Sequence, residues 1–237
     1  MHYGLPGSSR SAHLVSAMTE FKLVFVDPKP ELCAVFHQYF EGLPNVEIVA
    51  GRFEQLAAFD CMVSAANSFG LMDGGVDGAI TRFFGDALMQ RVQERILREF
   101  LGEQNVGTSI IVETGHRQHP FIAHTPTMRS PMEIAHTDNV YRATWAMLLA
   151  VRQHNERQER KIRLVACPGM GTGTGHVPYA EAARQMSMAY RNYLNPPQHI
   201  GWDLAMDRQL EIRYGGDLGF HFPPETVMRK PAVATPL

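Results

Sequence analysis

Apolar runs of strand length alternate along the chain with segments whose apolar side chains recur at helical spacing. The run Phe-Lys-Leu-Val-Phe-Val at 21–26 is short and rich in β-branched and aromatic residues, which is typical of a strand. From residue 76 onward, apolar residues return every three or four positions, which is typical of a helix. The pattern predicts strands at 21–26, 46–50, 61–65, 107–114, 120–125 and 162–167. It predicts helices at 27–42, 76–102, 137–160 and 178–194, and a short helical connection at 52–58.

Strands that alternate with helices favour an α/β fold with a mostly parallel sheet that helices cover on both sides. Within 76–102, Gly85 predicts a break, with Asp86 capping the continuation and Gly102 ending it. After Pro197 the pattern weakens: 202–206 fits a short helix, 209–214 a last strand, and 215 onward a loose tail. We therefore expect a flexible leader or expression remnant at 1–17, one domain at 18–195, and a partly ordered C-terminal extension at 196–237.

Composition narrows the class of protein. The chain has 237 residues, 45% hydrophobic and 19% charged, so one α/β domain with a substantial core is expected. A formal net charge of −2 provides no global field that would attract nucleic acid or an anionic membrane. Cys33, Cys61 and Cys167 are widely spaced, which argues against a disulfide framework or a zinc site and favours the cytoplasm. No apolar run reaches membrane-spanning length, and residues 1–17 lack a signal-peptide pattern.

The stretch from 64 to 80 joins a predicted strand to a predicted helix through a glycine-containing loop. Gly74 and Gly75 permit a sharp turn, and the helix that follows directs its first N–H groups and positive dipole end at the loop. This combination is typical of an anion site, most often for phosphate. Asn67 ends the strand and Asp77 lies in the first helical turn. These two residues have either a catalytic role or the ordinary roles of a turn former and a helix-start acid.

A second loop, Pro168-Gly169-Met170-Gly171-Thr172-Gly173-Thr174-Gly175-His176-Val177-Pro178, repeats this arrangement between a strand and a helix. Alone, a glycine-rich loop is most often only a turn. Two such loops beyond the carboxyl ends of strands can hold the two phosphates of a diphosphate. Neither loop matches a P-loop or the dinucleotide fingerprint, so phosphate binding without hydride transfer or NTP hydrolysis is the better interpretation.

The block Ala-Asn-Ser-Phe-Gly-Leu-Met-Asp-Gly-Gly-Val-Asp-Gly-Ala-Ile, with Gly-Thr-Gly about a hundred residues later, closely resembles the macro domain. It is most similar to a bacterial or phage branch, and the resemblance covers roughly residues 21–193. The resemblance implies a three-layer α/β/α sandwich, with a mixed, mostly parallel sheet of about six strands, that binds ADP-ribose. The segment 74–80 would contact one phosphate and the distal ribose, and 171–175 would wrap the diphosphate.

The resemblance also implies roles for individual residues. The loop is similar to the hydrolytic MacroD-type motif, in which Asn67 would position the distal ribose and Asp77 would orient or deprotonate a water that attacks C1″. No metal and no cofactor are required for this scheme. The implied ligand-binding residues are Phe53, Ala66, Gly74, Gly75, Val76, Gly78, Ala79, Ile80, Gly171, Thr172, Gly173, Thr174, Gly175 and His176.

This sequence departs from the family pattern at several positions. Arg52 replaces the aspartate that reads the adenine amino group and cannot accept that hydrogen bond, although Phe53 could stack on a base. Ser64 replaces an asparagine and Thr81 a histidine of hydrolytic members, while Met72 and Asp73 replace glycines.

The leading hypothesis is hydrolysis of an ADP-ribosyl ester bond on protein, nucleic acid or an acyl group, as in a mono-ADP-ribosyl hydrolase or an O-acetyl-ADP-ribose deacetylase. The alternative is a non-catalytic reader of ADP-ribose or a related nucleotide. The expected partner is ADP-ribose or an ADP-ribosylated substrate, and nucleic acid is expected only as a modified substrate. We expect no membrane association and a monomeric chain. His176 either contacts a phosphate or is an ordinary solvated loop residue. Tyr190 and Phe220 are candidates for lining an adenine pocket.

Overall fold

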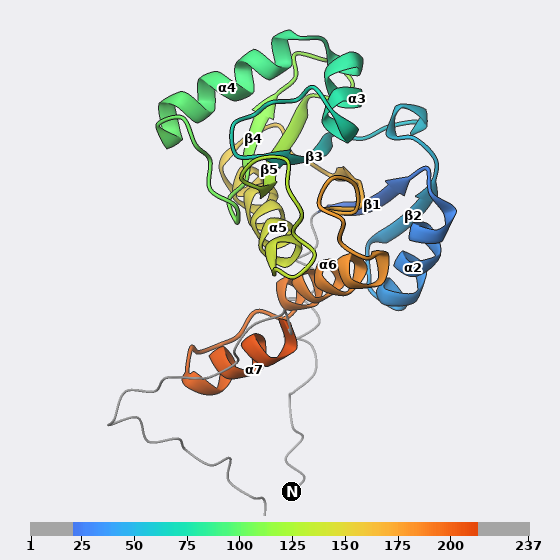
Figure 1. Cartoon of the computed structure of the whole chain (residues 1–237), viewed down its shortest axis with the longest axis vertical. Helices are drawn as coiled ribbons and strands as arrows, with labels where there is room; N and C mark the ends of the chain where they lie inside the picture. Colours follow the sequence, from blue (N-terminus) through green and yellow to red (C-terminus); the bar gives the residue numbers. More distant parts are fainter. Residues whose placement is uncertain (1–20, 213–237) are drawn as a thin grey trace, which may run out of the picture. The chain divides into compact units, whose positions relative to one another are not determined.

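The computed structural model describes residues 21–212 (Figure 1). These residues fall into two units, a body that ends at Pro196 and a segment that begins at Pro197, and each is described by itself. The expected leader at 1–17, and Tyr214 and Phe220, lie outside the described residues.

The body alternates strands and helices, as the hydrophobic pattern predicts. Its elements are β1 (Lys22–Asp27), α2 (Pro30–Phe40), β2 (Val46–Ala50), the 3₁₀ helix η1 (Phe53–Gln55), β3 (Cys61–Asn67), α3 (Gly75–Phe84), α4 (Ala87–Phe100), β4 (Ile110–Glu113), β5 (Phe121–Met128), α5 (Asn139–Arg157), β6 (Leu164–Cys167) and α6 (Tyr179–Leu194). The connection expected at 52–58 is therefore a single 3₁₀ turn.

Six strands form one sheet in the order β2-β1-β6-β3-β5-β4. β1 pairs in parallel with β2 and β6, and β3 pairs in parallel with β5 and β6. Only β4 runs antiparallel, against β5, because the two strands form a hairpin. The prediction of a mixed, mostly parallel sheet is confirmed.

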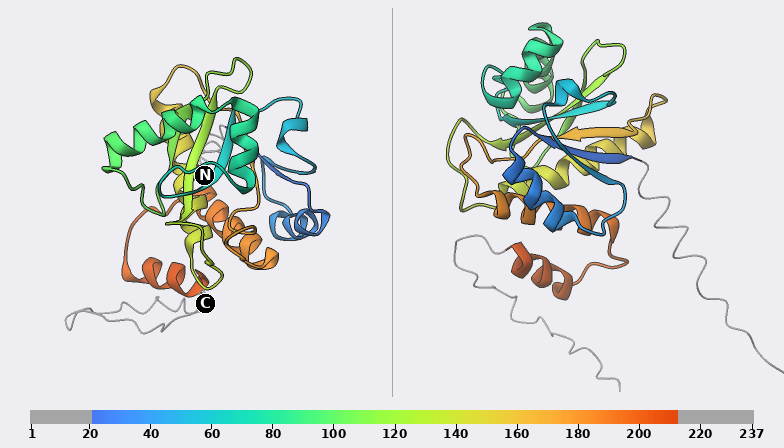
Figure 2. Two further views of the ribbon diagram at one scale, coloured as in Figure 1. Left: turned by 45° about the horizontal axis from the view of Figure 1, so that its top comes forward. Right: turned by 90° about the vertical axis from the view of Figure 1, so that its right-hand side faces the viewer.

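Helices cover both faces of this sheet, which confirms the three-layer α/β/α fold. Figure 2 shows α3 and α4 on one face and α2, α5 and α6 on the other. Apolar side chains fill both interfaces. Under α3 and α4 the core contains Met62, Ile80, Leu88 and Val92, all fully buried. On the other face, the Phe25 ring lies 4.7 Å from that of Phe36 and 4.4 Å from that of Phe40, measured between centroids.

The predicted break between α3 and α4 is confirmed at Gly85, which has a φ of +90° that favours glycine. Asp86 occupies the N-cap position of α4 as expected, but its side chain forms no capping hydrogen bond. Leu101, in the left-handed conformation, ends α4 one residue before Gly102. In the described part of the chain, no helix combines the length and apolar character that a bilayer span requires.

The second unit contains the helix α7 (Trp202–Ile212), which corrects one prediction. Residues 209–212 are helical and not part of a last strand. The alternation of Leu210 and Ile212 with polar residues imitates a strand. However, leucine, alanine, methionine, arginine, glutamine and glutamate fill the run, and these residues favour the helix.

The cluster of Phe25, Phe36 and Phe40, between the sheet and α2, stabilises the body. Replacing Phe25 with Ala should lower the free energy of unfolding by about 3–5 kcal/mol, because a fully buried ring is lost and a cavity remains. The matched control is Leu97→Ala on α4, where the side chain is 65% exposed and a change within about 0.5 kcal/mol is expected. Urea unfolding of both variants measures the difference, and equal losses would contradict this description of the core.

Candidate functional site

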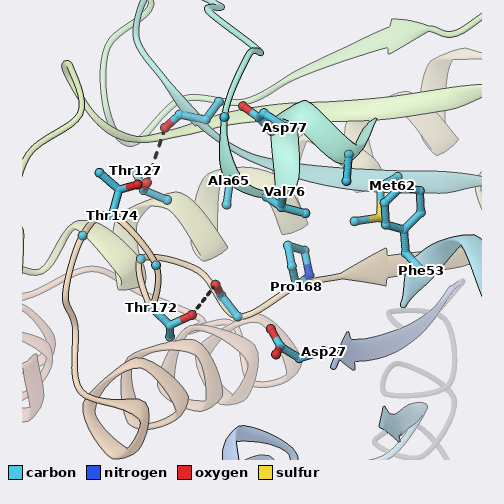
Figure 3. Close-up of a pocket in the computed structure, with 18 of the residues that line it drawn as sticks. Asp27, Phe53, Met62, Ala65, Val76, Asp77, Thr127, Pro168, Thr172 and Thr174 are labelled. Atoms are coloured by element: carbon cyan, nitrogen blue, oxygen red, sulfur yellow. Dashed lines mark hydrogen bonds between the residues drawn. The ribbon is translucent and has the colours of Figure 1, made fainter. Parts of the chain in front are cut away.

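A cavity of about 500 Å³ opens at the carboxyl ends of β1, β3 and β6 (Figure 3). Its walls come from the residues after β1 and β2, the end of β3, the loop and first turn of α3, the end of β5, and the loop after β6. Ligands of open α/β sheets bind beyond the carboxyl ends of the strands, and small-molecule sites have volumes of about 300–1,000 Å³. Both the position and the size of the cavity therefore suit a small-molecule ligand.

The first glycine loop forms one wall, where α3 begins. Gly75 has a φ of +56°, a conformation that favours glycine. A Cβ atom added to Gly74 or Gly75 would meet no heavy atom within 4 Å, so open space lies above this backbone. Both residues line the cavity. An anionic group can thus approach the N-terminus of α3, where unpaired N–H groups and the helix dipole favour negative charge.

The second glycine loop forms the opposite wall and is closely folded. Gly171 has a φ of +72°, and a Cβ atom there would lie 2.9 Å from Val140. A Cβ atom on Gly175 would lie 2.6 Å from the carbonyl oxygen of Gly171. The backbone at Gly175 therefore passes too close to the backbone at Gly171 for any side chain at position 175. The N–H of Val177 donates to the carbonyl of Gly171 at 3.0 Å. The loop is therefore ordered by its own contacts, with Gly173 facing the cavity.

Asp77 is the most strongly perturbed acid at the site. It lies in the first turn of α3, lines the cavity, and is only 6% exposed. Ser64, fully buried on β3, donates a hydrogen bond from Oγ to Oδ1 of Asp77 at 2.7 Å. Burial raises the pKa of Asp77 from 3.8 to about 7, although the Ser64 hydrogen bond lowers it. Asp77 can therefore exchange a proton near neutral pH, as a general base must.

Asn67 lines the cavity, but its amide is occupied by its own loop. Its Nδ2 donates to the carbonyl of Leu71 at 2.8 Å. Its Oδ1 accepts from the N–H groups of Phe69 at 3.0 Å and Leu71 at 3.3 Å. These contacts are those of a turn-forming asparagine, and they order the chain between β3 and Gly74.

Two of the departures from the family pattern contact each other. Thr81 donates from Oγ1 to the carbonyl of Met72 at 2.8 Å, which ties α3 to the loop before it. The Met72 side chain is fully buried, whereas Asp73 is exposed and lines the cavity.

The structure brings most of the predicted site residues to one cavity. Those that line it are Phe53, Ala66, Asn67, Gly74, Gly75, Val76, Asp77, Ala79, Gly171, Thr172, Gly173, Thr174 and Gly175. Gly78, Ile80 and His176 are not among the lining residues. Ile80 is fully buried in the core, and His176 is exposed on the loop. At Gly78 an added Cβ would lie 3.0 Å from the carbonyl oxygen of Asp73, so this glycine allows close packing.

Aromatic residues are distributed differently from expectation. Phe53 lines the cavity, but its edge-on contact with Phe83, 5.5 Å between centroids, holds it in the core. Tyr190 lies on α6, is 1% exposed, and donates from its hydroxyl to the carbonyl of Pro44 at 2.8 Å. The suggestion that Tyr190 lines an adenine pocket is therefore wrong.

Several lining residues were not predicted from the sequence. Asp27 is the last residue of β1, Lys29 precedes α2, Arg82 lies on α3, and Thr127 lies near the end of β5. Asp27 carried a usable signal, because a polar residue directly after a buried strand reaches the carboxyl edge of a parallel sheet. Figure 3 shows Asp77 on the α3 side of the cavity, Thr172 and Thr174 on the opposite loop, and Asp27 below Pro168.

Among the residues that the structure describes, no three His, Cys, Asp or Glu side chains come together in a way that could hold a metal ion. The donors at this cavity include backbone N–H groups, hydroxyls and the side chains of Lys29, Arg52 and Arg82, which suit an anionic organic ligand.

Comparison with known proteins places the chain in a family. The macro domain family model matches residues 63–186. A protein of Aquifex aeolicus without a characterised function is 32% identical over 150 residues, covering 63% of this chain and 82% of its own length. An O-acetyl-ADP-ribose deacetylase of Salmonella gallinarum is 31% identical over 162 residues, covering 65% of this chain and 84% of its own.

A solved structure agrees with the sequence matches. The Oceanobacillus iheyensis macrodomain with ADP is 25% identical at a TM-score of 0.50, covering 59% of this chain and 71% of that chain. The cavity between two glycine loops, at the carboxyl edge of a sheet that helices cover on both faces, agrees with this match. The chain belongs to the macro domain family.

The raised pKa of Asp77 predicts a pH-dependent stability. The folded state binds this proton more tightly than the unfolded chain, so the contribution is full below pH 3.8 and is lost as the pH rises to about 7. Relative to Asp77→Asn, which does not titrate, the wild type should lose up to about 1.4 kcal/mol per pH unit across this window. Urea unfolding at several pH values measures the difference, and a constant difference from pH 4 to 8 would contradict the burial argument.

Proposed function

We propose that this chain binds ADP-ribose and hydrolyses an ADP-ribosyl ester bond. The observation that carries the proposal is Asp77, a buried carboxyl with a pKa of about 7 at the end of a pocket between two glycine loops. The relative named as an O-acetyl-ADP-ribose deacetylase, 31% identical, supports the same substrate class.

The geometry suggests how the reaction would proceed. The diphosphate would lie between Gly74–Gly75 and the 171–175 loop, with the helix dipole of α3 favouring its charge. The distal ribose would then lie beside Asp77. The ionised carboxylate would take a proton from a water whose oxygen attacks C1″. The C1″–O bond to the acyl group breaks, and the acyl group leaves with the bonding electrons as a carboxylate.

The alternative function is a reader of ADP-ribose without catalysis. Asn67 favours this alternative, because its amide is already bonded to Leu71 and Phe69 and would have to share those contacts with a ribose. Ser64 and Asp77 favour catalysis, because a hydrogen bond from a buried serine holds the acid in a defined rotamer.

Two assays distinguish these functions. Calorimetry with ADP-ribose tests binding, and no binding even at millimolar ligand would exclude both. Release of ADP-ribose from a glutamyl-ADP-ribosylated protein tests hydrolysis. We expect Asp77→Ala to lower kcat by about 10²–10⁴-fold while ADP-ribose still binds, and wild-type kcat to rise with pH through about 7.

Asn67→Ala is the informative companion variant. If Asn67 only orders its loop, this variant should lower the free energy of unfolding and weaken ADP-ribose binding with a smaller loss of kcat than Asp77→Ala. Leu97→Ala, far from the pocket on the exposed face of α4, serves as the matched control. Equal turnover by wild type and Asp77→Ala would remove Asp77 from the mechanism.

A further inference from the structure

One end of the pocket is built by a part of the chain that the family model does not match. That model covers residues 63–186, whereas Asp27 at the end of β1, Lys29 just before α2, and Arg52 and Phe53 after β2 also line the cavity. β1 and β2 are neighbours in the sheet, and Asp27 is in register with Ala50. These residues therefore lie on one side of the cavity, outside the range that the family model matches.

Asp27 is held in place on this wall. Its Oδ1 accepts from the N–H of Lys29 at 3.0 Å, and its backbone carbonyl accepts from the N–H of Gly51 at 3.0 Å. The ammonium of Lys29 lies 5.4 Å from the Tyr179 ring centroid, turned to a different partner. Among the described residues, no cation forms an ion pair with Asp27 within 4.0 Å.

Asp27 is thus a carboxylate without a paired cation in a pocket proposed to hold a diphosphate. An ionised carboxylate only accepts hydrogen bonds, and it repels a phosphate that lies nearby. It therefore suits a part of the ligand that carries N–H or O–H donors. Given the phosphates between the glycine loops and the distal ribose beside Asp77, that part is the nucleoside, whose donors are the base amino group and the ribose hydroxyls. Arg52 on the same wall has only donors and cannot substitute.

We propose that Asp27 is a specificity-determining residue whose carboxylate accepts a hydrogen bond from a donor on the nucleoside half of the ligand. The inference rests on the proposed function, because it takes ADP-ribose as the ligand. Apolar contact alone discriminates weakly between nucleosides, whereas an acceptor that is left unpaired penalises a ligand without the donor.

Three nucleotides test this assignment by calorimetry. They are ADP-ribose, its hypoxanthine analogue IDP-ribose, which has a carbonyl in place of the amino group, and the analogue whose adenosine ribose lacks the 2′- and 3′-hydroxyls. Wild type should bind ADP-ribose at least about 10-fold more tightly than one of the two analogues. The analogue that is rejected identifies which donor Asp27 contacts.

Two variants and a control complete the experiment. Asp27→Asn keeps an oxygen for the Lys29 N–H, and Asp27→Ala removes the acceptor. Both should weaken ADP-ribose binding by about 10-fold and reduce the preference over the rejected analogue to within about threefold. Glu31→Gln on the neighbouring helix α2, exposed and outside the pocket, removes an equal charge and should leave all three affinities unchanged.

The outcomes separate this inference from the proposed function. If wild type binds ADP-ribose but does not prefer it to either analogue, or if the Asp27 variants keep the wild-type preference, the assignment of Asp27 is wrong and the proposed function stands. If wild type fails to bind ADP-ribose, the proposed function fails and the assignment fails with it.

Discussion

The parallel alignment of β1, β6, β3 and β5 is the constraint on which the site depends. In this alignment every one of these strands ends at the same edge of the sheet, so the loops that follow them share one cavity. The two glycine loops are about a hundred residues apart in sequence, yet they face each other because β3 and β6 are paired. Hydrophobic burial on both faces of the sheet maintains this alignment, and the glycines allow the backbone to approach a ligand closely.

The same burial has a second consequence at Asp77. The carboxyl lies at the N-terminus of α3, where the helix dipole favours the ionised form, and against β3, where loss of solvent favours the protonated form. The hydrogen bond that Ser64 donates to the carboxyl favours the ionised form and partly offsets the effect of burial. An acid in this position is costly for stability at neutral pH but suited to exchange a proton with water, so under the proposed function stability and activity would depend on opposite properties of one residue.

Most of the fold could be predicted because hydrophobic periodicity reports burial directly. β2 has the bounds that the pattern predicts, and Gly85 breaks the helix pair as expected. The error at 209–212 arose because alternation of Leu210 and Ile212 outweighed helix propensity in the prediction. The two glycine loops were recognisable because glycine at a strand end has a local physical meaning.

The contacts between elements could not be predicted from the sequence. No local sequence pattern indicates that Ser64 donates a hydrogen bond to Asp77, because this contact depends on how α3 packs on β3. The amide contacts of Asn67 depend on the path of its loop. The position of Asp27 at a strand end indicates the carboxyl edge of the sheet, but its place in the pocket depends on β1 lying beside β6, which strand order in sequence does not specify.

The central claim is that the two glycine loops together hold the diphosphate of ADP-ribose. Amide chemical-shift mapping of the ¹⁵N-labelled chain during titration with ADP-ribose tests it most directly. The account predicts the largest shifts at Gly74, Gly75 and the 171–175 loop, with saturation of both loops at the same ligand concentration. Unchanged amides in both loops, with shifts instead in the groove lined by Arg91, Arg95 and Arg160, would contradict it.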